Sequence, residues 1–162
     1  GFTISPRAWH TGGAPANVST AGTNLSIVTT ELYVAEVFVP ANATITGVAY
    51  FAGDATNGNQ KVMLFDSAGT RVAISATTSV AGDTADAYTR IAFATPYAAK
   101  GPATYYVGVI CDDNTHRLNT HVIGQCGAGK LTGLVYATES GYATIAVPDT
   151  FTTGLGPIAS LY

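Results

Sequence analysis

The segment KVMLFDSAGTRVAIS, residues 61–75, constrains the fold more than any other part of the chain, because its pattern predicts a β-hairpin. Two runs of strand-forming residues flank Asp66-Ser67-Ala68-Gly69, where the Asp favours a type I turn and the Gly can take the positive φ of a bulge. The expected register places Asp66 opposite Thr70, and it pairs Leu64 with Val72 and Val62 with Ile74. A hairpin alone is marginally stable in water, so the rest of the chain must extend this sheet.

The two faces of this hairpin differ in polarity. The four paired aliphatic side chains share one face, which is expected to lie in a core. The other face carries Lys61, Met63 and Phe65 on its first strand, and this mixture predicts a face that is half-exposed to water.

Further strands are predicted wherever β-branched and aromatic residues run between turn signals. The segments are 32–39, 44–52, 88–94, 104–111, 115–123, 131–138 and 142–147, with a short candidate at 158–162. Pro96 is expected to end the strand 88–94, in which Tyr88 and Arg90 share one side. Segment 104–111 is the most hydrophobic and predicts a central strand covered on both faces, whereas the polar alternation of 115–123 indicates an edge.

Many short strands without a helical period predict an all-β fold, and we expect an antiparallel two-sheet jelly-roll-like β-sandwich. Residues 1–30 are rich in Pro, Gly, Ser and Thr and are expected to form an extended N-terminal arm that drapes over its own sandwich or docks on a neighbour. The sandwich domain is expected over residues 31–148, followed by an irregular C-terminal tail at 149–162.

The low charge of the chain limits its partners. Only 10% of the residues are charged, against about 25% in typical soluble domains. A net charge of −3 without a basic run makes nucleic acid and acidic membranes poor partners, and no stretch is apolar enough to span a bilayer. The first ten residues lack the basic and apolar segments of a signal peptide. A weakly charged surface tolerates packing against copies of itself, although many extracellular all-β proteins share this composition.

No motif predicts a catalytic or metal site. The segment Gly124-x-x-x-x-Gly129-Lys130 lacks the hydroxyl that a phosphate loop needs, because Leu131 occupies that position. The histidines His10, His116 and His121 are expected at the surface or in turns, and no cofactor or metal is expected. Asp54, Asp83, Asp86, Asp112 and Asp113 lie in turns, where a Ca²⁺ site or a glycosidase pair is an alternative to simple backbone hydrogen bonding.

The cysteines and aromatic residues leave alternatives open. A disulfide between Cys111 and Cys126 would be compatible with their spacing, but two unpaired thiols are the default expectation. Exposed rings on a sandwich face can stack on sugars, and the same rings fill cores and interfaces equally well. If the chain recognises host glycans as a carbohydrate-binding or receptor-binding module, the stacking residues are expected to be Trp9, Tyr88 and Tyr97.

Three segments within residues 31–111 carry a family likeness: YVAEVFVPANATITGV, KVMLFDSAGTRVAIS and IAFATPYAAKGPATYYVGV. They resemble β-sandwich domains of tailed-bacteriophage virion proteins, of the head-decoration and the tail-fibre or receptor-binding types. The resemblance implies a non-enzymatic structural protein on the outside of the virion, an extracellular particle, that binds major capsid or tail subunits. It also implies a symmetric homo-oligomer such as a trimer. The expected subunit contacts are Phe2, Ile4, Trp9, Ile158, Leu161 and Tyr162.

Overall fold

The computed structural model describes residues 9–11, 23–121, 128–132, 134, 136–137, 142–146, 152–153 and 156–162. Within these ranges the chain is all-β and contains no α-helix, hence no helix that could cross a membrane. The strands are β1 (Thr23–Ser26), β2 (Leu32–Val39), β3 (Ala43–Phe51), β4 (Asn59–Phe65), β5 (Arg71–Ile74), β6 (Thr78–Ser79), β7 (Tyr88–Ala99), β8 (Ala103–Cys111), β9 (Arg117–Thr120), β10 (Ala128–Leu131), β11 (Thr152–Thr153) and β12 (Ala159–Leu161).

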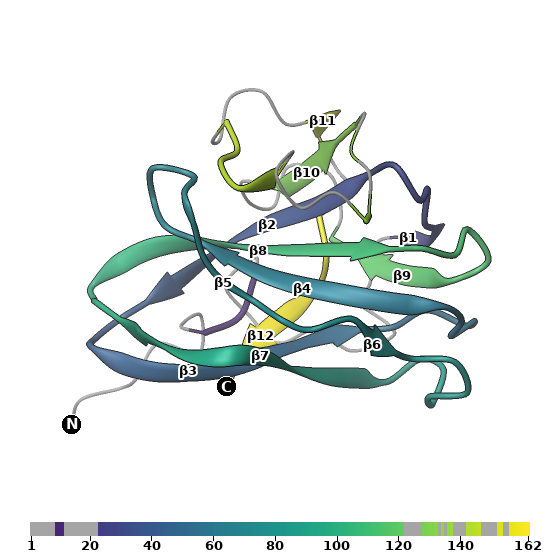
Figure 1. Cartoon of the computed structure of the whole chain (residues 1–162), viewed down its shortest axis with the longest axis horizontal. Coiled ribbons are helices and arrows are strands. Elements are labelled where there is room, and N and C mark those ends of the chain that lie inside the picture. Colours follow the sequence, from purple (N-terminus) through teal and green to yellow (C-terminus); the bar gives the residue numbers. More distant parts are fainter. Residues whose placement is uncertain are drawn as a thin grey trace.

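Two antiparallel sheets pack face to face, which confirms the expected β-sandwich (Figure 1). The larger sheet has the order β11-β10-β2-β8-β4-β5, with β6 also paired to β4, and the smaller sheet has the order β12-β3-β7. Strands β1 and β9 form a separate antiparallel pair at one end of the molecule. The predicted domain boundaries stay a prediction, but β1 and β12 lie in the predicted arm and tail and both are paired to other strands.

The main core fills the space between the two sheets. Side chains alternate along each strand, so every second residue of β2, β3, β4 and β8 points into this space. Tyr33, Val48, Leu64 and Val107 are examples, and all four are fully buried. Strand β8 lies between β2 and β4 and is covered on both faces, as its hydrophobicity predicts.

A second core lies on the outer face of the larger sheet, where the sequence predicts a half-exposed surface. Met63 and Phe65 are fully buried there, so that prediction is wrong. The face is covered by the side chains of Leu131, Leu134, Tyr136, Tyr142 and Ile145. Residues 143 and 145 are also joined to the hairpin by backbone hydrogen bonds. The Ile145 N–H donates to the Gly69 carbonyl at 2.8 Å, and the Arg71 N–H donates to the Ala143 carbonyl at 2.9 Å.

The hairpin turn forms as predicted, but its register differs by one residue. The Asp66 N–H donates to the Thr70 carbonyl at 2.9 Å, and Gly69 has a φ of 83°. A further irregularity beyond the turn leaves Val72 opposite no residue, so Leu64 pairs with Ala73 instead of Val72. A bulge of this kind cannot be anticipated from turn chemistry, because it depends on how the strand meets its neighbours.

Four other strand predictions need correction. Strand β7 continues through Pro96 to Ala99, because Pro96 lies where the register with β3 shifts and no ladder N–H is required. The predicted strand 115–123 is shorter in the structure, where β9 spans residues 117–120. It forms a two-stranded sheet with β1 and so lies at an edge as expected, but Leu118 and Thr120 are buried. In the predicted strands 131–138 and 142–147, the described residues form only the end of β10 and an isolated bridge between Thr144 and Thr70.

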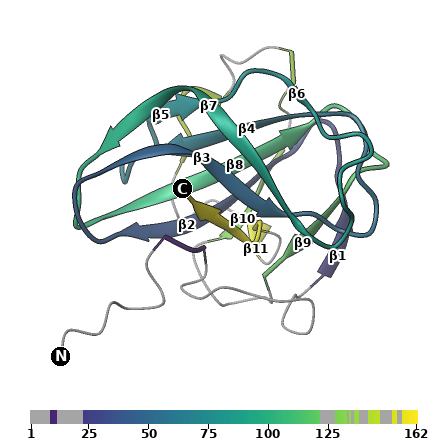
Figure 2. The same cartoon turned by 90° about the horizontal axis from the view of Figure 1, so that it is seen from below.

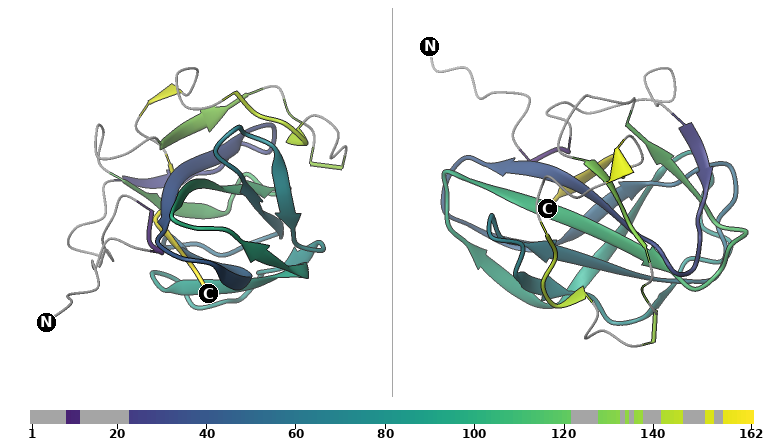
Figure 3. Two further views of the ribbon diagram at one scale, coloured as in Figure 1. Left: turned by 90° about the vertical axis from the view of Figure 1, so that its left-hand side faces the viewer. Right: turned by 90° about the horizontal axis from the view of Figure 1, so that it is seen from above.

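Both long edges of the sandwich are closed by short backbone contacts. On one side, Ser75 bridges to Phe93 of β7 and joins the larger sheet to the smaller one. The left view of Figure 3 shows the strands curving around the interior of the molecule. On the other side, residues 9–11 lie between β12 and β2. The Trp9 N–H donates to the Phe38 carbonyl at 2.9 Å, and the Thr11 N–H donates to the Ala159 carbonyl at 2.8 Å. The two sheets therefore close into a flattened barrel, which leaves the outer face of β12-β3-β7 as a continuous surface.

Candidate functional site

A groove with a volume of about 430 Å³ lies on the outer face of the smaller sheet, which faces the viewer in Figure 2. It is lined by His10, Ala49, Tyr88, Arg90, Ser160 and Tyr162. Its position follows from the register, because Ala49 on β3 lies opposite both Arg90 on β7 and Ser160 on β12. His10 bridges to Ser160 on the far side, so one row of residues crosses the whole sheet.

The groove is concave because its centre is built from small residues. Ala49 and Ser160 occupy the middle of the row, and larger side chains stand on either side. Gly47 lies two residues before Ala49 on the same outward face of β3, and it also keeps the groove open. A Cβ atom at Gly47 would lie 2.5 Å from the Tyr162 hydroxyl oxygen, so only glycine lets the Tyr162 ring lie against the strand.

Tyr162 and Arg90 form a stacked pair at one end of the groove. The backbone holds Tyr162 in place, since its carbonyl accepts hydrogen bonds from the Thr46 N–H at 2.6 Å and from the Gly47 N–H at 3.2 Å. The guanidinium carbon of Arg90 lies 3.9 Å from the centroid of the Tyr162 ring. This cation–π contact restricts an arginine that is otherwise exposed to solvent.

Tyr88 stands at the other end, two residues before Arg90 on the same face of β7. Its ring leans on Phe51 with a centroid distance of 5.1 Å, and 39% of the residue remains exposed. Phe51 itself is 4% exposed, so it acts as a support for Tyr88 and not as a second platform. The exposed part of Tyr88 is one of the few large apolar surfaces among the described residues.

The electrostatics of the groove are simple. Arg90 is the one lining residue with a permanently charged side chain, and none of the lining residues is an Asp or a Glu. Burial lowers the pKa of His10 from its ordinary value of 6.5, so this imidazole is neutral at pH 7. Nδ1 of His10 is buried and has no hydrogen-bond partner within the described residues. A chain of net charge −3 thus carries a locally positive groove.

The structure separates the three predicted stacking residues. Tyr88 lines the groove, whereas Trp9 and Tyr97 are partly buried and pack against the main core. Tyr97 also meets the ring of Tyr105 edge to face at 6.2 Å. Burial raises the pKa of Tyr97, and the hydrogen bond with Tyr105 acts in the same direction.

Four of the predicted subunit contacts lie within the described residues, and Phe2 and Ile4 lie outside them. Ile158 and Leu161 are buried in the chain's own fold. Trp9 donates its N–H to β2 and accepts one from Leu161 at 2.8 Å. Tyr162 is partly exposed and lines the groove. Intersubunit roles for these residues stay a prediction.

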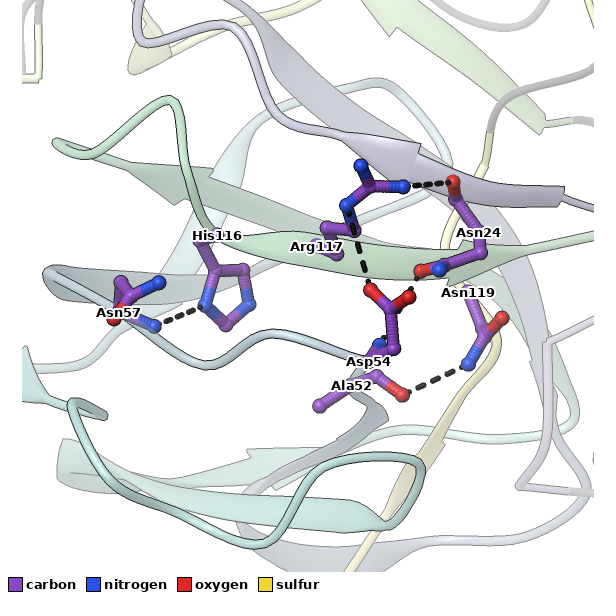
Figure 4. A network of polar contacts seen from close by, with 7 residues as sticks. All are labelled: Asn24, Ala52, Asp54, Asn57, His116, Arg117 and Asn119. Carbon is purple, nitrogen blue, oxygen red and sulfur yellow. Dashed lines mark hydrogen bonds and ion pairs between the residues drawn. The ribbon is translucent and has the colours of Figure 1, made fainter.

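A polar network ties β1 and β9 to the end of β3 on a different part of the surface (Figure 4). Nε of Arg117 lies 3.4 Å from a carboxylate oxygen of Asp54, and the Asp54 N–H donates to the Asn24 side chain at 3.3 Å. The Asn119 side chain donates to the Ala52 carbonyl at 2.8 Å. These contacts are local and structural, and they hold the small β1-β9 pair against the sandwich.

Two further acidic residues considered for a hydrolytic or Ca²⁺ site, Asp112 and Asp113, are engaged in the same local way, whereas Asp83 and Asp86 are exposed. Asp112 accepts two hydrogen bonds from Asn59, at 2.7 and 2.8 Å. Asp113 accepts two from Thr115, and these hydrogen bonds lower its pKa. Within the described part of the chain, no three His, Cys, Asp or Glu side chains gather into a group that could hold a metal ion.

His116 and His121 are expected at the surface or in turns, but both are buried, so a surface position is wrong for them. His116 does end a turn, because its N–H donates to the Asp113 carbonyl at 3.3 Å. Nδ1 of His116 accepts a hydrogen bond from the Asn57 N–H at 3.1 Å, and Nε2 lies 3.4 Å from the Tyr50 hydroxyl. Burial lowers the pKa of His116, although the carboxylates of Asp113 and Asp83 oppose this shift. Nε2 of His121 lies 2.8 Å from the Thr11 hydroxyl. Both imidazoles therefore support the fold from inside the protein.

The thiol of Cys111 is free and buried, and Cys126 lies outside the described residues. Burial raises the pKa of the Cys111 thiol to about 11. This matches the default expectation of an unpaired, inert thiol for Cys111.

Sequence reasoning identified Tyr88 but missed the residues that complete the groove. The alternation of side chains along β7 places Arg90 on the same face as Tyr88, so the sequence pattern could have predicted that Arg90 also lines the groove. Nothing in the sequence brings residues 10, 49, 160 and 162 next to them, because that depends on the pairing of β12 with β3 and on the insertion of residues 9–11.

Comparison with known proteins identifies a family but no function. No curated protein and no solved structure matches the chain. One family model, described as a domain of unknown function (DUF4082), matches residues 22–154. The match covers most of the chain and includes the strands from β1 to β11. The chain therefore belongs to the DUF4082 family.

Proposed function

We propose that this domain is a non-catalytic carbohydrate-binding module that holds a sugar in the groove lined by Tyr88, Arg90 and Tyr162. The observation that carries the proposal is a concave site with a tyrosine at each end and a floor of small residues. Its volume of about 430 Å³ falls within the range of roughly 300–1,000 Å³ found for ligand pockets.

The chemistry of the lining suits a sugar. Sugar rings present C–H groups on their faces and hydroxyls at their edges. The exposed face of Tyr88 can cover the former, and the hydroxyls of Ser160 and Tyr162 and the guanidinium of Arg90 can hydrogen-bond to the latter. Because the site is built on paired strands, its geometry is largely set before the ligand arrives.

The proposal is for binding without hydrolysis. Cleavage of a glycosidic bond commonly requires two carboxyl groups that flank the bond. None of the six lining residues has a carboxylate side chain, and the side chains of Asp112 and Asp113 are engaged with local partners.

The test is a glycan panel followed by calorimetry with the best saccharide. Tyr88→Ala is expected to weaken binding at least about ten-fold, the equivalent of about 1.4 kcal/mol. Phe38→Ala is the matched control, because Phe38 is an exposed aromatic on β2 of the other sheet, with 45% exposure, and does not line the groove. Thermal unfolding of each variant shows whether the fold is retained. Binding to no saccharide, or equal affinities of the two variants, would refute the proposal.

The hypothesis of a virion surface protein stays a prediction. Its test is whether protein that lacks the N-terminal arm still assembles with capsid or tail subunits. Residues 9–11 pair with β2 and β12 of the same chain, so an informative deletion ends before Trp9.

A further inference from the structure

We propose that the groove selects an acidic saccharide and binds the carboxylate of the sugar through the guanidinium of Arg90. This inference rests on the proposed function, since it names the class of sugar that the same site takes.

The first reason is that the positive charge of Arg90 is not neutralised. Arg117 and Lys130 lie within 4 Å of the carboxylates of Asp54 and Glu31, at 3.4 and 2.7 Å respectively. Among the described residues Arg90 has no ion pair with an Asp or Glu side chain, and none of the residues that line the groove is an Asp or a Glu. An unpaired cation in a site of a net negative protein favours a ligand that brings its own negative charge.

The second reason is the orientation of the guanidinium. Its central carbon lies over the Tyr162 ring, 3.9 Å from the ring centroid, which is close enough for the guanidinium to stack on the ring. A stacked guanidinium keeps its N–H donors at the edge of the plane, where they can bind both oxygens of a carboxylate. Because Tyr162 is fixed by hydrogen bonds from Thr46 and Gly47, the arginine loses less conformational freedom when it binds.

The third reason is the spacing between the charge and the stacking surface. Tyr88 and Arg90 are two residues apart on one face of β7, which places their Cα atoms about 6.6 Å apart along the strand. A sugar ring that rests on Tyr88 therefore brings an exocyclic carboxylate within reach of Arg90. A single arginine beside a neutral His10 matches one negative charge and suits a carboxylate better than a phosphate dianion.

The experiment compares three oligosaccharides that differ only in their acidic group. These are oligogalacturonate, its methyl ester and neutral oligogalactose, with affinities measured by calorimetry at low and at physiological salt. We expect wild-type protein to bind the acid at least about ten-fold more tightly than the other two at low salt. Raising the salt should narrow this difference without affecting the neutral sugars.

Arg90→Gln is expected to abolish the preference for the acid, so that the variant binds the acid, the methyl ester and the neutral sugar with similar affinities. The matched control is Lys100→Gln, which removes the same charge from an exposed residue just after β7 and outside this groove. If the two variants lose the preference equally, the effect is general electrostatics and the inference fails.

The failure of this inference is distinguishable from failure of the proposed function. Equal binding of the acid, ester and neutral sugars would overturn the carboxylate assignment and leave the carbohydrate-binding module standing. Tighter binding of a sulfated oligosaccharide than of the uronate would overturn the assignment in the same way. Binding of none of these sugars, nor of any on the panel, would overturn both.

Discussion

Truncation of Phe65 to alanine tests the second core, the part of the fold that differs most from the sequence-based expectation. Phe65 is the last residue of β4 and points away from the main core. It is fully buried, and its ring packs against β8 so closely that a Cβ atom at Gly108 would lie 2.9 Å from its Cε2 atom. If the outer face of β4 were half-exposed, as its sequence suggests, this ring would contribute little.

The magnitude follows from burial and cavity formation. Transfer of a phenylalanine side chain from water to a core contributes about 1.5–3 kcal/mol. The cavity left by its removal adds to this loss, and Phe→Ala substitutions in cores cost about 3–5 kcal/mol in total. For a domain of this length, each kcal/mol lowers the Tm by roughly 2–4 °C, so the variant should melt about 6–20 °C below wild type.

Urea unfolding with linear extrapolation measures the change in the free energy of unfolding. The matched control is Phe38→Ala, the same substitution on β2 of the same sheet at a residue that is 45% exposed. We expect the control to lose less than about 1 kcal/mol. Similar small losses in the two variants would refute the second core, because they would mean that side chains such as those of Tyr142 and Ile145 do not cover Phe65.

Three further predictions concern buried polar groups. Thr11→Val should lower the free energy of unfolding by about 1–3 kcal/mol. The reason is that the buried Thr11 hydroxyl donates a hydrogen bond to the Pro157 carbonyl and accepts one from the Ala159 N–H, each at 2.8 Å. An equal loss in a variant of an exposed threonine would contradict this prediction. The folded-state pKa of His116 lies below 6.5, so stability is complete above pH 6.5 and falls as the pH drops below it. Urea unfolding at pH 7.5 and 5.0 should show a smaller pH dependence in His116→Gln than in wild type, and an unchanged slope would contradict the assignment. The buried Cys111 thiol has a pKa of about 11, so it should resist alkylation in native protein at pH 8 and react in urea. Mass spectrometry of the labelled protein measures this difference. Rapid labelling of the native protein would refute the burial of the thiol.

Much of the fold could be predicted because it depends on local patterns. The hairpin turn follows from Asp66 and Gly69, whose chemistry fixes the loop whatever surrounds it. The alternation of β7 and the continuous hydrophobicity of β8 likewise predict which strand has a polar face and which is covered on both sides.

The errors arise where long-range contacts override local patterns. Met63 and Phe65 are buried because side chains about 70 residues later in the chain, such as that of Tyr142, pack over them. Nothing in the sequence of β4 itself predicts these contacts. Pro96 does not end β7 because the bulge opposite β3 removes the need for its N–H. His116 is buried because its ring nitrogens find partners in Asn57 and Tyr50, which a local reading of a polar turn cannot foresee.

The candidate site shows the same division. By itself the sequence determined that Tyr88 and Arg90 share one face of a strand, because side chains in a strand alternate with a period of two. Only the tertiary structure decided that Tyr162, Ser160 and His10 complete a groove around them. The physical reason is that alternation is a property of one strand, whereas a groove requires several strands in a particular order and register, and that order is set by packing between residues far apart in the chain.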